Sequence, residues 1–74
     1  MKNNISIIFG KSLQKIRKER KWSQEKFADI IGIHRTYLGA IERGEKNITI
    51  ITIHKISKAL NVSISELFEM IKLD

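Results

Sequence analysis

Hydrophobic residues recur along this chain at spacings of three and four positions, and short polar stretches separate one group from the next. In the N-terminal segment, Ile5, Phe9, Leu13 and Ile16 fall on one stripe of a helix. Four later groups follow the same spacing, and the chain contains no proline and no internal repeat. The pattern predicts an all-α fold of five short helices, forming a single domain over residues 1–74.

Polar residues and one glycine mark the expected ends of these helices. Ser23 and Thr49 are suitable N-caps, and Ser63 with Glu66 has the spacing of a capping box. Gly32 can adopt the left-handed conformation that ends a helix. The predicted helices, with their caps, span about residues 5–20, 24–32, 34–44, 49–61 and 63–71.

The segment from 24 to 44 predicts a particular arrangement of the second and third helices. A turn at Gly32 and Ile33 joins them, and the small Ala28 lets the two helices cross closely. Leu38 and Ile41 would hold the third helix on the core. This pattern is typical of a helix-turn-helix, in which the first turn of the second of these helices is free to enter the DNA major groove.

Two residues at that exposed first turn are candidate base contacts. The planar guanidinium of Arg35 matches the O6 and N7 atoms of guanine, a contact that contributes about 1–3 kcal/mol of discrimination. Thr36 offers a hydroxyl to a base or a methyl group to thymine. The alternatives for Arg35 are a phosphate contact or a surface position with no role in binding, and the alternative for Thr36 is a purely helical role.

Further residues are candidate contacts to the DNA backbone, which set register and salt dependence rather than sequence preference. Gln24 lies where free N–H groups at a helix start favour a phosphate. His34 is interpreted as a helix cap or a phosphate contact, and Tyr37 either touches the sugar-phosphate edge or packs. The remaining candidates lie in or near the loop after the third helix: Arg43, Lys46, Asn47 and Thr52.

Charge supports this interpretation and narrows the function classes. The net charge is +6, and residues 1–48 carry eleven Lys and Arg against five Asp and Glu, whereas residues 49–74 carry three of each. A basic front with a neutral tail favours a polyanion partner and a protein-contact segment.

The chain has no cysteine, no nucleophile elbow and no phosphate loop, so we expect no enzyme activity, no cofactor and no metal site. No apolar run is long enough for a membrane span or a signal peptide, which predicts a cytoplasmic protein.

The runs 22–28, 32–38 and 41–44 together resemble the lambda-repressor-like (Cro-type) helix-turn-helix family. The run 35–47 is similar, more specifically, to the controller proteins of restriction–modification systems. The resemblance implies a five-helix domain that binds paired operators as a dimer and times endonuclease expression. It also implies a structural ion pair between Arg17 and Glu42, and a phosphate contact for Gln24.

Fifteen isoleucines exceed what one small core can hide, which predicts a homodimer. A two-fold axis would place the third helix of one chain ~34 Å from that of the other, so that these two recognition helices enter successive major grooves of a palindromic operator. The alternative for the same hydrophobic residues is an ordinary core behind the recognition unit. The candidate interface residues all lie in the last two helices: Ile50, Ile51, Ile53, Ile64, Leu67, Phe68 and Ile71.

Other functions stay open at this point. A phage-type repressor or an antitoxin of the same fold would share these features, and a helical protein-interaction module would need no DNA. For a regulator, RNA polymerase is a further expected partner. Such a protein would be encoded by a bacterium or a phage and would associate with the nucleoid through DNA.

Overall fold

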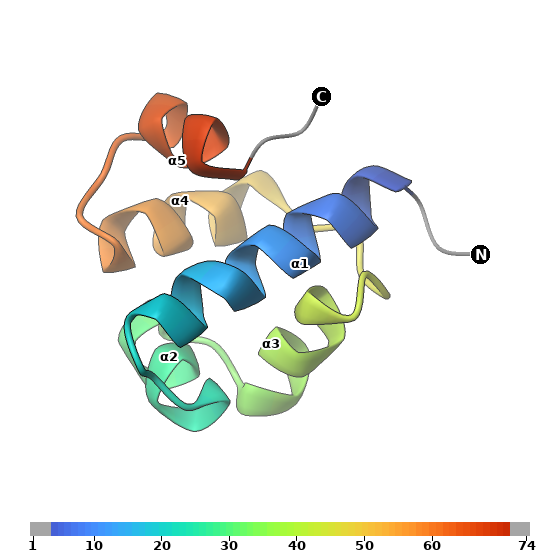
Figure 1. Ribbon diagram of the computed structural model, residues 1–74, viewed down its shortest axis with the longest axis vertical. Coiled ribbons are helices and arrows are strands. Elements are labelled where there is room, and N and C mark those ends of the chain that lie inside the picture. Colours follow the sequence, from blue (N-terminus) through green and yellow to red (C-terminus); the bar gives the residue numbers. More distant parts are fainter. Residues whose placement is uncertain (1–3, 72–74) are drawn as a thin grey trace.

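The computed structural model describes residues 4–71 of the predicted 1–74 domain, and this part of the chain forms five α-helices and no strand (Figure 1). The all-α prediction is confirmed. The helices are α1 (Asn4–Glu19), α2 (Gln24–Ile31), α3 (Arg35–Glu42), α4 (Ile50–Ala59) and α5 (Ile64–Ile71).

The predicted caps explain why the helices begin where they do. The Ser23 hydroxyl accepts a hydrogen bond from the Lys26 N–H at 3.0 Å and starts α2. Thr49 Oγ1 accepts the Thr52 N–H at 3.1 Å and starts α4. Such caps satisfy N–H groups that have no partner within the helix, and losing one costs about 1 kcal/mol.

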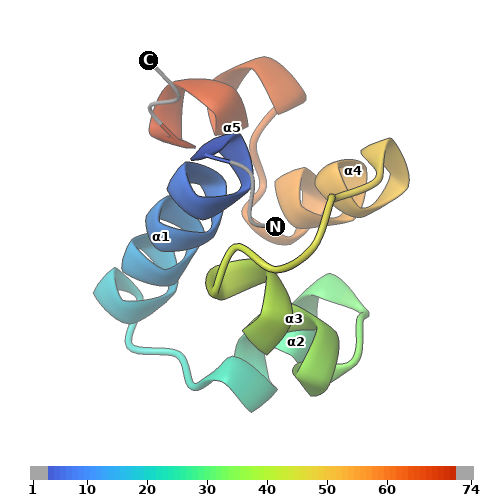
Figure 2. The ribbon, with the colours of Figure 1, turned by 90° about the vertical axis from the view of Figure 1, so that its right-hand side faces the viewer.

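Helix α1 crosses between two pairs of helices, as two perpendicular views show (Figures 1 and 2). It packs against α3 on one side and α5 on the other, while α2 contacts both α3 and α4. The shared core includes large side chains that are fully buried: Leu13, Phe27, Leu38, Ile41, Ile56, Leu67 and Ile71. Burying a side chain of this size stabilises the fold by about 1.5–3 kcal/mol.

Gly10 allows the close approach of α1 to the end of α3. A Cβ atom built at this position would meet the carbonyl oxygen of Ile41 and would lie 2.8 Å from that of Glu42. Both are backbone atoms, which cannot move aside as a flexible side chain could. The absence of a side chain at Gly10 therefore sets how α3 is held against α1.

Burial corrects part of the predicted dimer surface. Leu67 and Ile71 have 0% exposure within one chain, so they offer no surface to a second copy and belong to the core. Their positions on α5 face α1 and α4, which cover them. Conversely, Ile5 continues the sequence stripe of α1 but is 54% exposed, because the stripe runs past the end of the core.

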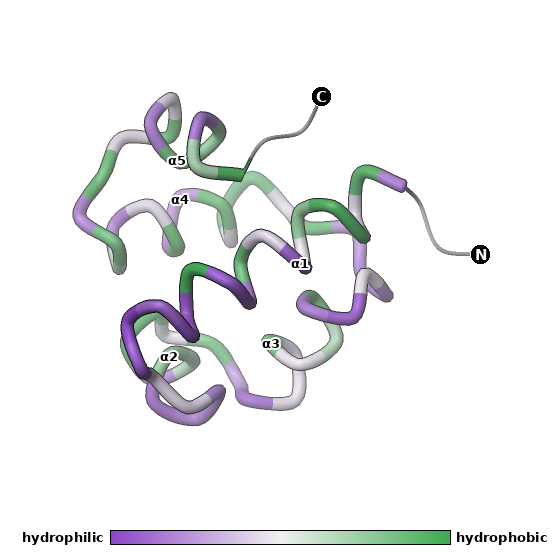
Figure 3. Tube along the Cα trace, in the orientation of Figure 1, coloured by the Kyte–Doolittle hydropathy of each residue, from purple (hydrophilic) through white to green (hydrophobic). Residues whose placement is uncertain are grey.

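Hydropathy along the trace differs between the two ends of α1 (Figure 3). The C-terminal end of α1 and the turn into α2 are strongly hydrophilic, whereas the beginning of α1 is hydrophobic. None of the helices in residues 4–71 is both long enough and apolar enough to cross a membrane.

Candidate nucleic-acid interface

The turn between α2 and α3 has the geometry that the sequence predicts. Gly32 has φ +87°, and its N–H donates to the Ala28 carbonyl at 2.8 Å. The N–H of Ile33 donates to the same carbonyl at 3.0 Å. A Cβ atom at Gly32 would meet no atom within 4 Å, so the left-handed backbone, rather than lack of space, favours glycine here. The turn fixes the direction in which α3 leaves α2.

The first turn of α3 is exposed at the surface. His34 is the N-cap: its Nδ1 accepts the Thr36 N–H at 3.1 Å, which requires an imidazole that is not protonated at Nδ1. Arg35 and Thr36 follow, and both are exposed. The Arg35 side chain is 64% exposed and lies 3.8 Å from a carboxylate oxygen of Glu25, a separation at which an exposed pair contributes little. Both candidate base contacts are therefore accessible to a partner.

An open depression of about 680 Å³ runs along the side of α3 toward the loop that follows it. Ala40 is buried and contributes its small side chain to the lining. The depression brings together most of the predicted backbone contacts with one predicted base contact. Its lining residues are His34, Thr36, Tyr37, Ala40, Arg43, Glu45 and Lys46.

Beneath this surface, a buried ion pair joins three helices. Arg17 donates through Nε to Glu42 Oε2 at 2.8 Å and through Nη2 to Glu42 Oε1 at 3.0 Å. Its Nη1 donates to the Trp22 carbonyl at 2.9 Å. The Gln24 amide donates to the same Glu42 Oε1 at 3.0 Å. The predicted pair is present, and it also holds Gln24, the residue expected to contact a phosphate.

Gly39 provides room on α3 for two of the predicted backbone contacts. A Cβ atom at this position would lie 3.2 Å from Arg43 Nη1 and 3.6 Å from Gln24 Oε1. The guanidinium and the amide therefore lie above the bare backbone of α3. Glycine is unfavourable inside a helix by about 1 kcal/mol relative to alanine, and a methyl group at this position would press on the exposed Arg43 guanidinium.

Two predicted residues differ from the others in their surroundings. Thr52 is buried, and its N–H and hydroxyl both lie within hydrogen-bonding distance of Thr49 Oγ1. The expectation that Thr52 contacts the DNA backbone stays a prediction, and its hydroxyl would make that contact while lying 3.1 Å from Thr49 Oγ1. Asn47, by contrast, is exposed in the loop before α4, close in sequence to Lys46.

Sequence reasoning missed one residue of this surface. Glu45 lines the depression and forms an ion pair with Arg43, with 3.1 Å between its Oε2 and Arg43 Nε. The bond and the charge of Glu45 together raise the pKa of Arg43 above its ordinary value. The sequence did contain a signal for this ion pair, because Glu45 follows Arg43, a candidate phosphate contact, by only two positions.

Comparisons with known proteins agree with this geometry. A helix-turn-helix family model matches residues 13–67. Control protein C.MunI of a Mycoplasma species is 45% identical over 71 residues, covering 95% of this chain and 96% of that protein. Control protein C.BamHI of Bacillus amyloliquefaciens is 44% identical over 70 residues, covering 93% and 86%. The crystal structure of the restriction–modification controller protein C.AhdI from Aeromonas hydrophila superposes with a TM-score of 0.78 at 36% identity, covering 85% of this chain and 96% of that one.

These matches confirm the resemblance that the sequence indicated, and with it the fold class. The relatives are controller proteins and transcription regulators rather than enzymes, in agreement with the expectation that this protein is not an enzyme. The chain belongs to the helix-turn-helix family and, within it, to the controller type of DNA-binding regulator.

Proposed function

We propose that this protein binds palindromic operator DNA as a homodimer and controls the genes of a restriction–modification system. The observation that carries the proposal is the exposed first turn of α3, with Arg35 and Thr36 accessible above a depression lined by cationic and hydrogen-bonding side chains. A helix presented in this way fits the major groove, where Arg35 can pair with guanine. The similarity to controller proteins supports the regulatory role.

In this proposal, contacts to the DNA backbone fix the position of α3. The amide nitrogen of Gln24 has two hydrogens, and Glu42 accepts one of them, so the other can point to a phosphate. His34 can donate from Nε2 while its Nδ1 caps the helix. The other proposed backbone contacts lie on or beside the depression: Tyr37, Arg43, Lys46 and Asn47.

Dimerisation is proposed from an apolar surface far from the first turn of α3. Ile50 and Ile51 are 76% and 66% exposed at the start of α4. Helix α4 also contributes to an apolar groove of about 260 Å³, whose lining residues are Ile5, Ser6, Phe9, Ile48, Ile53 and Phe68. Ile64 and Phe68 are also partly exposed, each 37%. A second copy that covers this surface would remove the largest exposed apolar side chains from water.

The remaining partners follow from this role. As an activator the protein would contact RNA polymerase, and as a DNA-bound regulator it would reside on the bacterial nucleoid. The genes beside its own should then encode a methyltransferase and an endonuclease. A phage lysogeny region or a toxin gene in their place would assign the same fold to a different regulator.

Duplex binding over a series of salt concentrations tests the proposal. We expect binding to random duplex at low salt that weakens with a log–log slope of about −0.9 for each phosphate neutralised. We expect tighter binding to an operator, at a stoichiometry of two chains per palindrome. A protein that binds no duplex even at low salt would instead be a helical protein-interaction module.

A further inference from the structure

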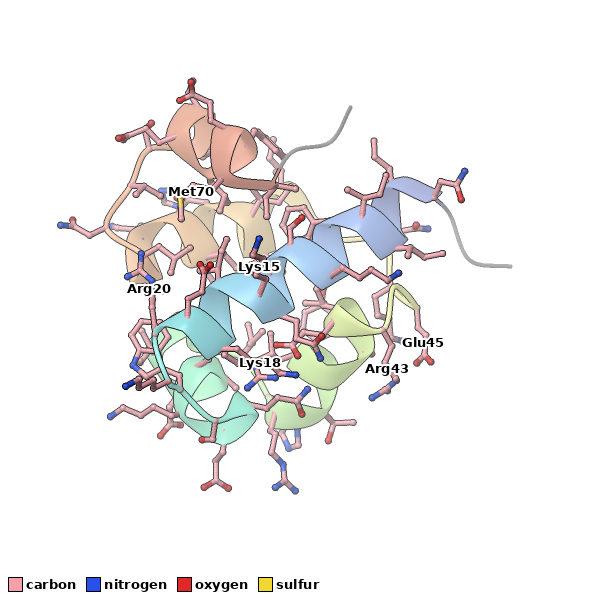
Figure 4. All side chains as sticks on the ribbon, viewed as in Figure 1. Lys15, Lys18, Arg20, Arg43, Glu45 and Met70 are labelled. Carbon is pink, nitrogen blue, oxygen red and sulfur yellow. The ribbon has the colours of Figure 1, made fainter. Side chains whose placement is uncertain are left out.

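The DNA-facing depression contains an acid among its cations. Of the described residues that line it, Glu45 alone is acidic, whereas Arg43 and Lys46 are cationic. Figure 4 shows the side chains of Arg43 and Glu45 beside one another, at the outer end of α3. A carboxylate at this place repels phosphates, so its presence in a DNA-binding surface calls for a physical explanation.

Glu45 fixes one edge of the Arg43 guanidinium. The Arg43 Nε atom lies 3.1 Å from Glu45 Oε2, and the two side chains are 57% and 41% exposed. Nη1 of the same guanidinium lies above Gly39, 3.2 Å from where a Cβ atom would stand. The carboxylate therefore holds the guanidinium at Nε, while Nη1 lies over the backbone of α3, on the side of the proposed DNA contact. Glu45 both orients Arg43 and offsets its charge.

These two effects differ between operator and other DNA. Binding to DNA of any sequence comes almost entirely from phosphates, so a nearby negative charge weakens it directly. In the operator complex, base contacts hold the protein in one register, in which an already oriented Arg43 meets its phosphate without a loss of side-chain entropy. Orientation then compensates for repulsion. In a loosely bound complex with no fixed register, only the repulsion remains.

We propose that Glu45 is a specificity-determining residue, which lowers affinity for non-operator DNA more than affinity for the operator. The inference rests on the proposed function, because it concerns the same DNA-binding surface. Ionic screening limits its reach to about 8–10 Å, so an acid elsewhere on the molecule should not have this effect.

The variant Glu45→Gln tests the proposal, because it keeps the size of the side chain but removes the charge, and with it both the repulsion of phosphates and the ion pair that orients Arg43. Dissociation constants are measured for a selected operator and for a scrambled duplex across a salt series. We expect binding to scrambled duplex to tighten about five-fold at moderate salt. The log–log salt slope for the scrambled duplex should steepen by about 0.9, the value for one additional neutralised phosphate. The affinity for the operator should change less than about two-fold.

Two further variants are matched to it. Glu45→Asp keeps the charge and should keep most of the discrimination between the two duplexes. Glu69→Gln removes one negative charge from α5, on the opposite side of the molecule from α3 (Figure 1), and should leave the discrimination unchanged. Thermal melting of each variant, compared with the unmodified chain, checks that the fold is retained.

Equal changes on both duplexes, or no change on either, would overturn the proposal. So would a loss of operator affinity in Glu45→Gln with a changed preference at one base pair, since that result would make Glu45 a reader of the cytosine amino group. If the unmodified protein binds neither duplex at low salt, the proposed function itself is wrong. That failure is recognised before any variant is compared.

Discussion

Arg17 and Glu42 form a bidentate ion pair that ties α1 to the end of α3, with donor–acceptor distances of 2.8 and 3.0 Å. The two side chains are only 10% and 1% exposed. The same carboxylate accepts the amide of Gln24, the first residue of α2. The position of α3 and the orientation of the Gln24 amide, a proposed phosphate contact, therefore both depend on the buried Glu42 carboxylate.

We expect Glu42→Ala to lower both stability and DNA binding. The substitution leaves the Arg17 guanidinium buried without a counter-charge, which costs about 3–5 kcal/mol for a fully buried pair. Denaturant unfolding measures the loss, and duplex binding is measured at a temperature where the variant is folded. An unchanged melting temperature would show that the pair has no structural role.

A double substitution separates the cost of an unpaired charge from the value of the pair. Arg17→Met combined with Glu42→Leu removes both charges and retains apolar volume, so it should be less destabilising than Glu42→Ala alone. Because it also removes the acceptor for Gln24, DNA binding should stay weakened even where stability recovers. Full recovery of both properties would mean that Glu42 does not position Gln24.

Gly10→Ala should destabilise the protein, although alanine is the better helix former by about 1 kcal/mol. The added methyl group would press on the backbone carbonyls of Ile41 and Glu42, and overpacking of this kind costs about 1–3 kcal/mol. Lys11→Ala, at the next and exposed position of α1, is the control. Denaturant unfolding of the two variants decides the point, and a stabilised Gly10→Ala would contradict the close packing of α1 on α3.

Replacing Ile50 and Ile51 together by serine should separate the proposed dimer without unfolding the chain. Both side chains are largely exposed in one chain, so their loss leaves its core intact. Burying each isoleucine in a dimer contributes about 1.5–3 kcal/mol to the free energy of association. We therefore expect the double variant to dimerise at least about 100-fold more weakly than the unmodified chain. Sedimentation equilibrium measures this, with Ile30→Ser on α2 as the control. An unmodified protein that stays monomeric at high micromolar concentration would exclude the dimer.

The start of α5 should contribute to stability in a pH-dependent way. The Glu66 carboxylate accepts the Ser63 N–H at 2.9 Å, and the Ser63 hydroxyl accepts the Glu66 N–H at 3.0 Å. These bonds with Ser63 hold the pKa of Glu66 below its ordinary value of 4.5. A carboxyl group with a lowered pKa in the folded state adds stability above its unfolded-state pKa and loses it as the pH falls through the folded-state pKa.

Glu66→Ala should therefore be less stable than the unmodified chain at neutral pH, and the difference should shrink as the solution is acidified below pH 4.5. Urea unfolding of both proteins over this range provides the measurement. A difference that stays constant into strong acid would show that the carboxylate does not act as a cap.

Local signals in the sequence were sufficient to predict where the helices end and where the turn between α2 and α3 lies. Ser23, Thr49 and the Ser63–Glu66 box act through bonds to residues three positions away, and Gly32 through its own backbone. Such features depend on near neighbours and can be read without knowing the fold. The exposure of the first turn of α3 followed from the same local pattern.

Features that depend on how helices cross could not be predicted in this way. Periodicity placed Leu67 and Ile71 on the apolar face of α5 but could not show that α1 and α4 already cover them. Gly10 has no local role, and its importance appears only with the carbonyls of α3 beside it. Thr52 looked like a polar loop neighbour, yet its hydroxyl is within hydrogen-bonding distance of its own helix cap.

Selection of bound duplexes from a random pool, carried out with the unmodified protein and with Arg35→Ala, tests most directly whether α3 reads DNA sequence. We predict that the unmodified protein selects a palindrome with a guanine preference in each half-site. Arg35→Ala should lose that preference, equivalent to about 1–3 kcal/mol at that position, and keep the rest of the motif. Selection of the same motif by both proteins, or of no motif by either, would contradict base reading by the first turn of α3.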